Sequence, residues 1–243
     1  MSGPLAADGR VTAAVGAVDW PAVRAGLDDV GGASAGTLLD AETCRQLVDA
    51  YEDDALFRST IDMARFRFGS GGYRYFAAPL PPVIQQLREA LWPHLLPVAR
   101  EWARRRGLLA SWPNELGEWL ERCHAAGQTR PTPLLLRYGG GDWNALHRDL
   151  YGELVFPLQV VIGLDRPGVD YDGGEFVLVE QRPRSQSRAT VFALGQGEAL
   201  VFTTADRPIR SAKGWSAAPV RHGVSVLRRG RRHTLGVLFH DAT

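Results

Sequence analysis

The chain has 243 residues, 45% of them hydrophobic, so it is long enough to bury a sizeable core as one large domain. It contains only two cysteines, Cys44 and Cys123, no apolar run behind the first methionine, and no stretch with the continuous apolar length of a membrane span. These features argue against a disulfide-stabilised secreted protein and against a membrane protein, and we expect a cytoplasmic location.

The net charge of +1 is unevenly distributed along the chain. From Gln181 to the C-terminus there are 11 Lys/Arg and 3 Asp/Glu, a balance of +8, which leaves −7 for residues 1–180. The C-terminal part is therefore basic. Because Lys213 is the single lysine of the chain, a composition bias of the source genome is an alternative explanation for the many arginines.

The N-terminal part predicts helices that follow a short leader. Residues 1–18, rich in Ala, Gly and Val, show little periodicity, and we expect a flexible leader there. Asp19, followed by tryptophan and proline, has the pattern of an N-cap with proline in the first turn and predicts a short helix. Asp40 predicts the cap of a second amphipathic helix, which would bury Cys44 as a core thiol.

Residues 19–133 as a whole predict a helical region with one strand-rich segment, at about 56–82. That segment places aromatic residues among arginines around three glycines, a pattern typical of strand–turn–strand. It could serve as a lid over a functional site, or it could simply cover a sheet edge. Residues 82–107 and 113–126 predict two further amphipathic helices, because apolar side chains return every three or four positions.

Residues 134–243 predict the β core of one integrated domain. Short runs rich in β-branched and aromatic residues alternate there with glycine-rich turns, which is typical of a β-sandwich or barrel. Periodicity does not choose between these two topologies. The runs are LLLRY, VFPLQVVIGL, GGEFVLVE, ATVFAL, EALVFTT, RHGVSVL and RHTLGVLF.

A candidate metal site begins with His147 and Asp149, which stand two apart in the stretch YGGGDWNALHRDLY and lie on one face if the backbone is extended. His222, in the C-terminal run, offers a third ligand. Two imidazoles and a carboxylate on one side of a metal leave the opposite positions open, an arrangement suited to non-haem Fe(II) oxygenases. His233 and His240 are rival ligands, but His233 faces away from the arginine before it and no arginine follows His240.

The H-x-D pair, the distal histidine, and Arg232 with Thr234 ten and twelve residues beyond it resemble the Fe(II)/2-oxoglutarate-dependent dioxygenase superfamily over roughly residues 134–240. The stretches CHAAGQTRPTPLLLRYGGGDWNALHRDLYGELVFPLQ and GGEFVLVEQRPRSQSR are similar to a bacterial subfamily proposed to oxidise bases in nucleic acids. The resemblance implies a mainly β fold with added helices (α+β), in which N-terminal helices back a double-stranded β-helix, or jelly-roll, core. It implies Fe(II), 2-oxoglutarate and O2 as cofactors. The implied metal-binding and catalytic residues are His147, Asp149 and His222.

The resemblance also implies a clamp for the cosubstrate. Arg232 and Thr234 share one face of an extended strand, so the guanidinium can hold the distal carboxylate of 2-oxoglutarate while the hydroxyl donates to it. Tyr138, on the strand before the H-x-D pair, is a further expected donor. If residues 228–231 form a turn, His222 and Arg232 lie on adjacent antiparallel strands within reach of one diacid.

The implied reaction is hydroxylation or oxidative dealkylation at a substrate C–H group, and we expect a base of DNA or RNA, single-stranded or damaged. Arg182, Arg184 and Arg188 follow a central strand, where basic side chains could hold phosphates near the mouth of the site. An exposed or flipped base could stack on aromatic side chains of the 56–82 segment. The expected stacking residues are Tyr73, Tyr75 and Phe76.

Two alternatives stay open. AlkB-type demethylases carry an asparagine two residues before the tyrosine, where this chain has Leu136, and the interval of ten residues between His222 and Arg232 is closer to that of prolyl hydroxylases. The first alternative is therefore a protein side-chain or small-molecule hydroxylase of the same chemistry. The second is a non-oxygenase metal-binding protein of the cupin type, although such a site has no need of a diacid clamp. The sequence indicates no oligomeric state.

Overall fold

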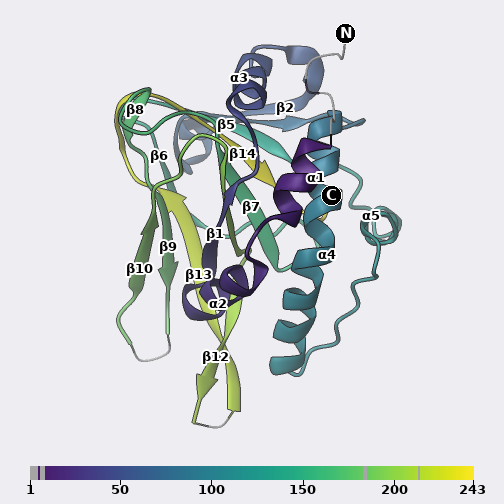
Figure 1. Ribbon diagram of the computed structural model, residues 1–243. Coiled ribbons are helices and arrows are strands. Elements are labelled where there is room, and N and C mark those ends of the chain that lie inside the picture. Colours follow the sequence, from purple (N-terminus) through teal and green to yellow (C-terminus); the bar gives the residue numbers. More distant parts are fainter. Residues whose placement is uncertain (1–4, 6–8, 183–184, 213) are drawn as a thin grey trace.

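Two antiparallel sheets packed face to face form the body of the protein (Figure 1). The computed structural model describes residues 5, 9–182, 185–212 and 214–243. The strands of the larger sheet are β1 Gly32–Thr37, β2 Phe57–Asp62, β4 Gly72–Phe76, β5 Leu134–Gly139, β7 Leu158–Gly163, β8 Tyr171–Gly173, β11 Glu198–Thr203 and β14 Leu227–Val237. Their order is β1-β11-β7-β14-β5-β4-β2, and β8 pairs with β14.

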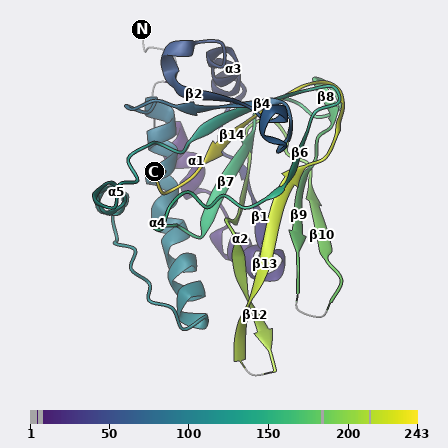
Figure 2. The ribbon, with the colours of Figure 1, turned by 180° about the vertical axis from the view of Figure 1, so that it is seen from behind.

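The smaller sheet faces the larger one. Its strands are β3 Gly69–Ser70, β6 Trp143–His147, β9 Phe176–Glu180, β10 Arg188–Phe192, β12 Asp206–Ser211 and β13 Gly214–Val224. Their order is β10-β9-β13-β6-β3, and β12 pairs with β13. From β5 onward the chain passes repeatedly from one sheet to the other, which is the jelly-roll arrangement and confirms the predicted core. Figure 2 shows the β12–β13 hairpin extending past the rest of the protein at one end.

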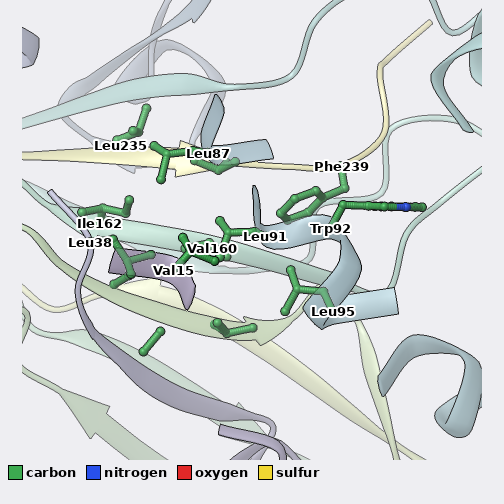
Figure 3. Close-up of a cluster of buried hydrophobic side chains, with 14 of the residues drawn as sticks. Val15, Leu38, Leu87, Leu91, Trp92, Leu95, Val160, Ile162, Leu235 and Phe239 are labelled. Carbon is green, nitrogen blue, oxygen red and sulfur yellow. The ribbon is translucent and has the colours of Figure 1, made fainter. Parts of the chain in front are cut away.

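The outer face of the larger sheet is covered by helices, chiefly by the longest (Figure 1). The helices are α1 Arg10–Gly16, α2 Trp20–Val30, α3 Ala41–Ala50, α4 Pro82–Arg105 and α5 Leu116–Ala125. Leu87, Leu91 and Leu95 form the buried stripe of α4, and they pack on Val160 and Ile162 of β7 (Figure 3). Each such leucine stabilises the fold by about 2 kcal/mol through burial. Within the described ranges, none of the helices is both long and apolar enough to cross a membrane.

The predicted helix starts are confirmed. Asp19 accepts a hydrogen bond of 3.0 Å from the backbone N–H of Ala22 at the start of α2, and Asp40 accepts one of 2.8 Å from Thr43 at the start of α3. The spans predicted for the two later helices contain α4 and α5. Cys44 is a buried free thiol, as expected.

The flexible leader expected over residues 1–18 is wrong for its second half. Residues 10–16 form α1, and Val11 and Val15 are 5% and 1% exposed in the same core as α4. Two valines four positions apart supply a stripe that a short helix can bury, even though their Ala and Gly neighbours show no longer pattern. Residues 1–4 and 6–8 lie outside the described residues.

The larger sheet crosses the predicted boundary at residue 134, because the N-terminal region contributes β1, β2 and β4. β1 consists of small residues and was not expected from the sequence. A Cβ on Gly32 would lie 2.6 Å from Leu178 of the facing sheet, so the strand needs a residue without a side chain there. Steric closeness, and not hydrophobicity, accounts for that glycine.

The strand–turn–strand prediction for residues 56–82 is confirmed, because β2 and β4 pair in antiparallel fashion. The residues between them reach across to the smaller sheet, where Gly69 of β3 pairs with Asn144 of β6. The segment therefore covers an edge of both sheets. Its opening and closing as a lid stays a prediction.

The turn expected at residues 228–231 is wrong. Those residues belong to β14 and reach β8, while the chain turns at Ser225-Val226. Because β13 and β14 lie in different sheets, His222 and Arg232 face each other across the sandwich and are not neighbours in one hairpin.

Candidate metal centre and its cavity

His147, Asp149 and His222 form a compact cluster between the sheets. Each offers one ligand atom, and the three atoms lie within 4.8 Å of one another. Nε2 of His222 is 3.1 Å from Oδ2 of Asp149, and Nε2 of His147 is 3.5 Å from Oδ1 of the same carboxylate. Two imidazoles and one carboxylate at this spacing can hold a divalent metal on one side only.

Strand register brings the distal histidine to the H-x-D pair. His222 of β13 stands directly opposite His147 of β6, and their ring centroids are 4.1 Å apart. Nδ1 of His147 lies 2.7 Å from the backbone oxygen of Ala145 and donates to it, since a carbonyl can only accept. That bond places the proton on Nδ1 and leaves Nε2 free to bind a metal.

The electrostatics of the cluster favour the ligand forms of its side chains. Burial acts to raise the pKa of Asp149, but the neighbouring His222 and His147 and the hydroxyl of Tyr151 together hold that pKa well below its usual value. Burial, followed by the charge of His222, lowers the pKa of His147 and keeps its imidazole neutral. A carboxylate and a neutral imidazole are the forms that bind metals.

A cavity of about 450 Å³ opens beside the cluster. This volume falls within the range of small-molecule sites, roughly 300–1,000 Å³. The cavity lies between the two sheets and is lined by side chains from both. It is bordered by all six residues predicted for the metal and the cosubstrate, which are His147, Asp149, His222, Tyr138, Arg232 and Thr234.

Arg232 is a buried cation without a full set of partners. Arg232 is 2% exposed, and its Nε and Nη1 have no hydrogen-bond partner among the described residues. The guanidinium carbon lies 5.7 Å from the ring centre of Tyr138 and 6.0 Å from that of Tyr171. Gly174, with φ +64°, makes room for it, because a Cβ there would lie 3.0 Å from Cδ of Arg232. Such a group calls for an anionic ligand, since an unpaired buried charge is costly.

These residues fit Fe(II) and 2-oxoglutarate. The metal donors and the partly unpaired guanidinium border one cavity. A diacid could therefore chelate the metal at one end and pair with the guanidinium at the other. Burial raises the pKa of Tyr138 to about 12, so its phenol keeps a proton to donate, and its oxygen accepts a bond of 3.3 Å from Asn144. The cosubstrate roles of Arg232, Thr234 and Tyr138 stay predictions.

The rival histidines lie outside the cluster. Nδ1 of His233 is 2.9 Å from Oδ2 of Asp165, on the face of β14 opposite Arg232. Nδ1 of His240 accepts a bond of 3.3 Å from the backbone of Phe156. Neither side chain lines the cavity.

The three aromatic residues expected to stack on a substrate differ in position. Tyr73 lines the cavity. Tyr75 is 8% exposed and packs edge-on between Tyr73 and Tyr151. Phe76 is fully buried, 4.8 Å from Phe57 in the core, so the stacking role expected for it is wrong. Alternation along β4 turns Phe76 to the face opposite Tyr73.

Two of the three arginines expected at the mouth of the site lie elsewhere. Nε of Arg182 is 2.6 Å from Oε1 of the buried Glu180, and Nη2 of Arg188 is 3.8 Å from the same oxygen. Neither arginine is among the residues that line the cavity. Arg184 lies outside the described residues.

Sequence reasoning missed several residues of the cavity. Tyr151 donates to Asp149, and its place on the 147, 149, 151 alternation was a usable signal. Gln159 is 3% exposed and borders the cavity, and its Nε2 has no hydrogen-bond partner among the described residues. A lone glutamine inside the apolar run LQVVIG was the signal for it. Arg67 and Phe68 line the mouth, but they stood unmarked among other arginines and aromatics.

Residues 71–242 match a protein family described as an oxygenase catalysing oxidative methylation of damaged DNA. Uncharacterised proteins from two strains of Mycobacterium tuberculosis are each 62% identical to this chain over 167 residues, which is 69% of this chain and 72% of the relative. The range matched by the family, residues 71–242, contains His147, Asp149 and His222 together with Tyr138, Arg232 and Thr234.

Two solved structures share the fold. A prolyl-4-hydroxylase from Pseudomonas putida superposes with a TM-score of 0.55 at 15% identity, over 92% of this chain and 99% of its own. A prolyl hydroxylase from Trichoplax adhaerens, in complex with a hypoxia inducible factor peptide fragment, superposes with a TM-score of 0.51 at 16% identity, over 90% of this chain and 88% of its own. At these identities the likeness concerns the fold alone.

Proposed function

Because the chain belongs to this oxygenase family over residues 71–242, we propose that it is an Fe(II)- and 2-oxoglutarate-dependent oxygenase that acts on a nucleic acid base. The membership confirms the oxygenase class and the subfamily that the sequence resembles. It also favours the oxygenase over a non-oxygenase metal-binding protein of the cupin type.

One arrangement carries the assignment of cofactors. The two-histidine, one-carboxylate cluster and the partly unpaired guanidinium of Arg232 border the same cavity from opposite sheets. A ligand that chelates a metal at one end and carries a carboxylate at the other satisfies both groups at once. 2-Oxoglutarate has this shape.

The chain's own residues bind, orient and exclude water. Bound Fe(II) and 2-oxoglutarate would supply an oxidant from O2 for a substrate C–H group, which becomes C–OH while 2-oxoglutarate becomes succinate and CO2. Tyr151 and the backbone of Ala145 orient two of the metal ligands. The rings of Phe176 and Phe202 lie 5.6 and 4.9 Å from that of His222 and keep that side of the metal site dry.

Two observations support a nucleic acid base as the substrate, and hydroxylation or oxidative dealkylation as the reaction. The matching family is described by its action on damaged DNA. The cavity of about 450 Å³ has the size of a small-molecule site, and Tyr73 offers an aromatic face on its wall. A base can reach such a site only from a single strand or after flipping out of a duplex.

Succinate formation without an added substrate tests the cofactor assignment. We expect His147→Ala, Asp149→Ala and His222→Ala to abolish anaerobic Fe(II) binding and Fe(II)-dependent conversion of 2-oxoglutarate to succinate. His94→Gln is the control, because His94 stacks on Trp20 away from the cavity. Full turnover by His222→Ala together with its loss in His240→Ala would show that the ligand assignment is wrong.

A substrate screen read by succinate release tests the substrate class. We expect stimulation by single-stranded or alkylated oligonucleotides and none by peptides or free amino acids. We also expect the logarithm of the binding constant for single-stranded DNA to fall with the logarithm of salt concentration with a slope of about −2 to −4, for three to five phosphate contacts. Turnover confined to a peptide or a free amino acid would show that this molecule, and not a nucleic acid, is the substrate. The oxygenase assignment would be unaffected.

A further inference from the structure

Exposed apolar side chains gather at the mouth of the cavity. Ten large apolar residues are strongly exposed in the described part of the chain, and five of them fall within two short segments, 66–68 and 143–150. Exposed apolar residues that stand singly are ordinary, whereas a patch beside a functional cavity marks an interaction site. We call these five residues, each 43–50% exposed, the cavity rim: Phe66, Phe68, Trp143, Leu146 and Leu150.

Strand pairing joins the two segments into one surface. Ser70 of β3 stands opposite Trp143 of β6, and the backbone oxygen of Phe68 accepts a bond of 2.7 Å from Ala145. In Figure 2 the turn between β2 and β4 accordingly lies beside β6. Phe68 and Leu146 also line the cavity, so the rim continues directly into the reaction site.

Two aromatic rings of the rim already stand as a stacking platform. The centroids of Phe66 and Phe68 are 5.8 Å apart, with an angle of 19° between the planes, and both rings are half exposed. Arg67, between them, has a φ of 61°, in the left-handed region that a non-glycine residue rarely occupies. Such a conformation persists only where the surrounding structure imposes it, and such places cluster at functional sites.

The positive charge beside this platform is not neutralised. The exposed side chains of Arg65 and Arg67 form no ion pair with any described residue, and the one carboxylate of the same turn, that of Asp62, caps the backbone of Ala64. By contrast, Arg182 and Arg188 share the buried carboxylate of Glu180. Free cations therefore accompany exposed aromatic rings at the rim, whereas the two described arginines of the β9–β10 hairpin are paired.

We propose that the cavity rim is the docking surface for single-stranded nucleic acid, with neighbouring bases stacked on Phe66 and Phe68, and phosphates held by Arg65 and Arg67. The next nucleotide along the strand then stands at the cavity mouth and places its base inside. This inference rests on the proposed nucleic acid substrate and assigns its binding surface. Flat rings match bases of any sequence, and the two cations match a phosphate backbone, which a neutral peptide does not provide.

Binding of a fluorescent oligo(dT) of about 12 nucleotides tests the surface, a length within the span that single-strand-binding folds cover. We expect Phe66→Ala/Phe68→Ala to weaken binding by about five- to 150-fold for each base that loses its stacking partner. When the same strand carries one 2-aminopurine, the wild-type protein should quench the fluorescence of that base and this variant should not. Arg65→Gln/Arg67→Gln should reduce the steepness of the log–log salt dependence by about 1.4, or roughly 0.7 for each phosphate contact.

Two controls match these substitutions. Arg24→Gln removes an exposed arginine of α2 that lies away from the cavity, and Arg182→Gln/Arg188→Gln removes the two described arginines of the β9–β10 hairpin. We expect wild-type affinity and salt dependence from both. The substituted side chains are at least partly exposed, so each variant should keep the wild-type melting temperature, and in the two control variants succinate formation without substrate should be unchanged.

The possible outcomes separate the inference from the proposed function. If the rim variants bind as tightly as wild type while Arg182→Gln/Arg188→Gln loses affinity, the strand runs over the hairpin and the rim assignment is overturned. If both sets bind as wild type, the rim is overturned as well. If the wild-type protein forms succinate but binds neither single-stranded DNA nor RNA at low salt, the nucleic acid substrate fails first, and the rim assignment fails with it.

Discussion

The hydroxyl of Tyr151 donates a hydrogen bond of 2.8 Å to Oδ1 of Asp149. The other oxygen of this carboxylate stands 3.1 Å from His222, so each oxygen has its own partner and the plane of the carboxylate is set before any metal arrives. Groups that orient a metal ligand in this way typically contribute 10- to 100-fold to metal affinity.

Replacing Tyr151 by phenylalanine should therefore weaken anaerobic Fe(II) binding by about 10- to 100-fold. The ring packing against Tyr75 and His240 is kept, so the melting temperature of the metal-free protein should change little. Tyr51→Phe, which removes a buried phenol away from the cluster, is the control and should bind Fe(II) as wild type does. Equal Fe(II) affinity in both variants would mean that Tyr151 only fills space.

Two buried glutamines should respond in opposite directions to replacement by leucine. Nε2 of Gln159 has no hydrogen-bond partner among the described residues, so Gln159→Leu should raise the free energy of unfolding by about 1–3 kcal/mol. Gln128 donates to the backbone oxygens of Leu154 and Asp241, and its own oxygen accepts from Leu154. Gln128→Leu should cost about 3 kcal/mol, because it leaves those buried groups unpaired. Urea unfolding of both proteins without ligands measures the contrast, and a loss of stability in Gln159→Leu would contradict it.

Replacing either of two buried arginines by methionine should likewise have contrasting effects on stability, and also on the affinity for 2-oxoglutarate. Arg232→Met removes a guanidinium with two unpaired nitrogens, so it should leave the stability of the ligand-free protein intact and weaken 2-oxoglutarate binding at least about 100-fold. Arg88 lies 3.1 Å from the buried Asp241, away from the cavity. Arg88→Met should cost about 3 kcal/mol of stability and leave the affinity for 2-oxoglutarate unchanged. Calorimetric titration with 2-oxoglutarate under anaerobic conditions and thermal melts separate the two effects. Equal affinity for 2-oxoglutarate in both variants would contradict the role of Arg232 in binding the cosubstrate.

His240 should make the protein less stable in mildly acidic solution. Burial, and then the charge of Arg88, lower the pKa of His240 to about 4, below the value of about 6.5 for an unfolded chain. Between these values the unfolded chain binds the proton more readily, so stability is full above pH 6.5 and is lost as the pH falls towards 4. The expected loss is about 3 kcal/mol. His240→Asn, which can still accept from Phe156, should lack this component, whereas His94→Gln should keep it. Denaturant unfolding across this pH range checks the difference, and parallel curves for wild type and His240→Asn would contradict it.

The parts of this protein that follow local rules could be predicted from the sequence. Helix caps need only a short side chain and the next turn of backbone, which is why Asp19 and Asp40 located α2 and α3. The H-x-D pair needs only the alternation of an extended strand, and the order of His222, Arg232 and Thr234 after it was enough to indicate the superfamily. The buried polar groups of the site follow from that pattern, because the chemistry of a metal and a diacid limits which residues can serve.

Features that depend on which surfaces of the chain come into contact could be determined only from the tertiary structure. The two ends of the cosubstrate site come from opposite sheets, since the chain turns at Ser225-Val226 and not at 228–231. Phe76 packs in the core against Phe57, a contact that depends on the pairing of β2 with β4. Arg182 pairs with Glu180, which is buried beside Arg207, a residue of the more distant strand β12. The cavity rim could not be predicted from the sequence for the same reason. Phe68 and Leu146 are ordinary apolar residues until β3 pairs with β6 and leaves both exposed at the mouth of one cavity.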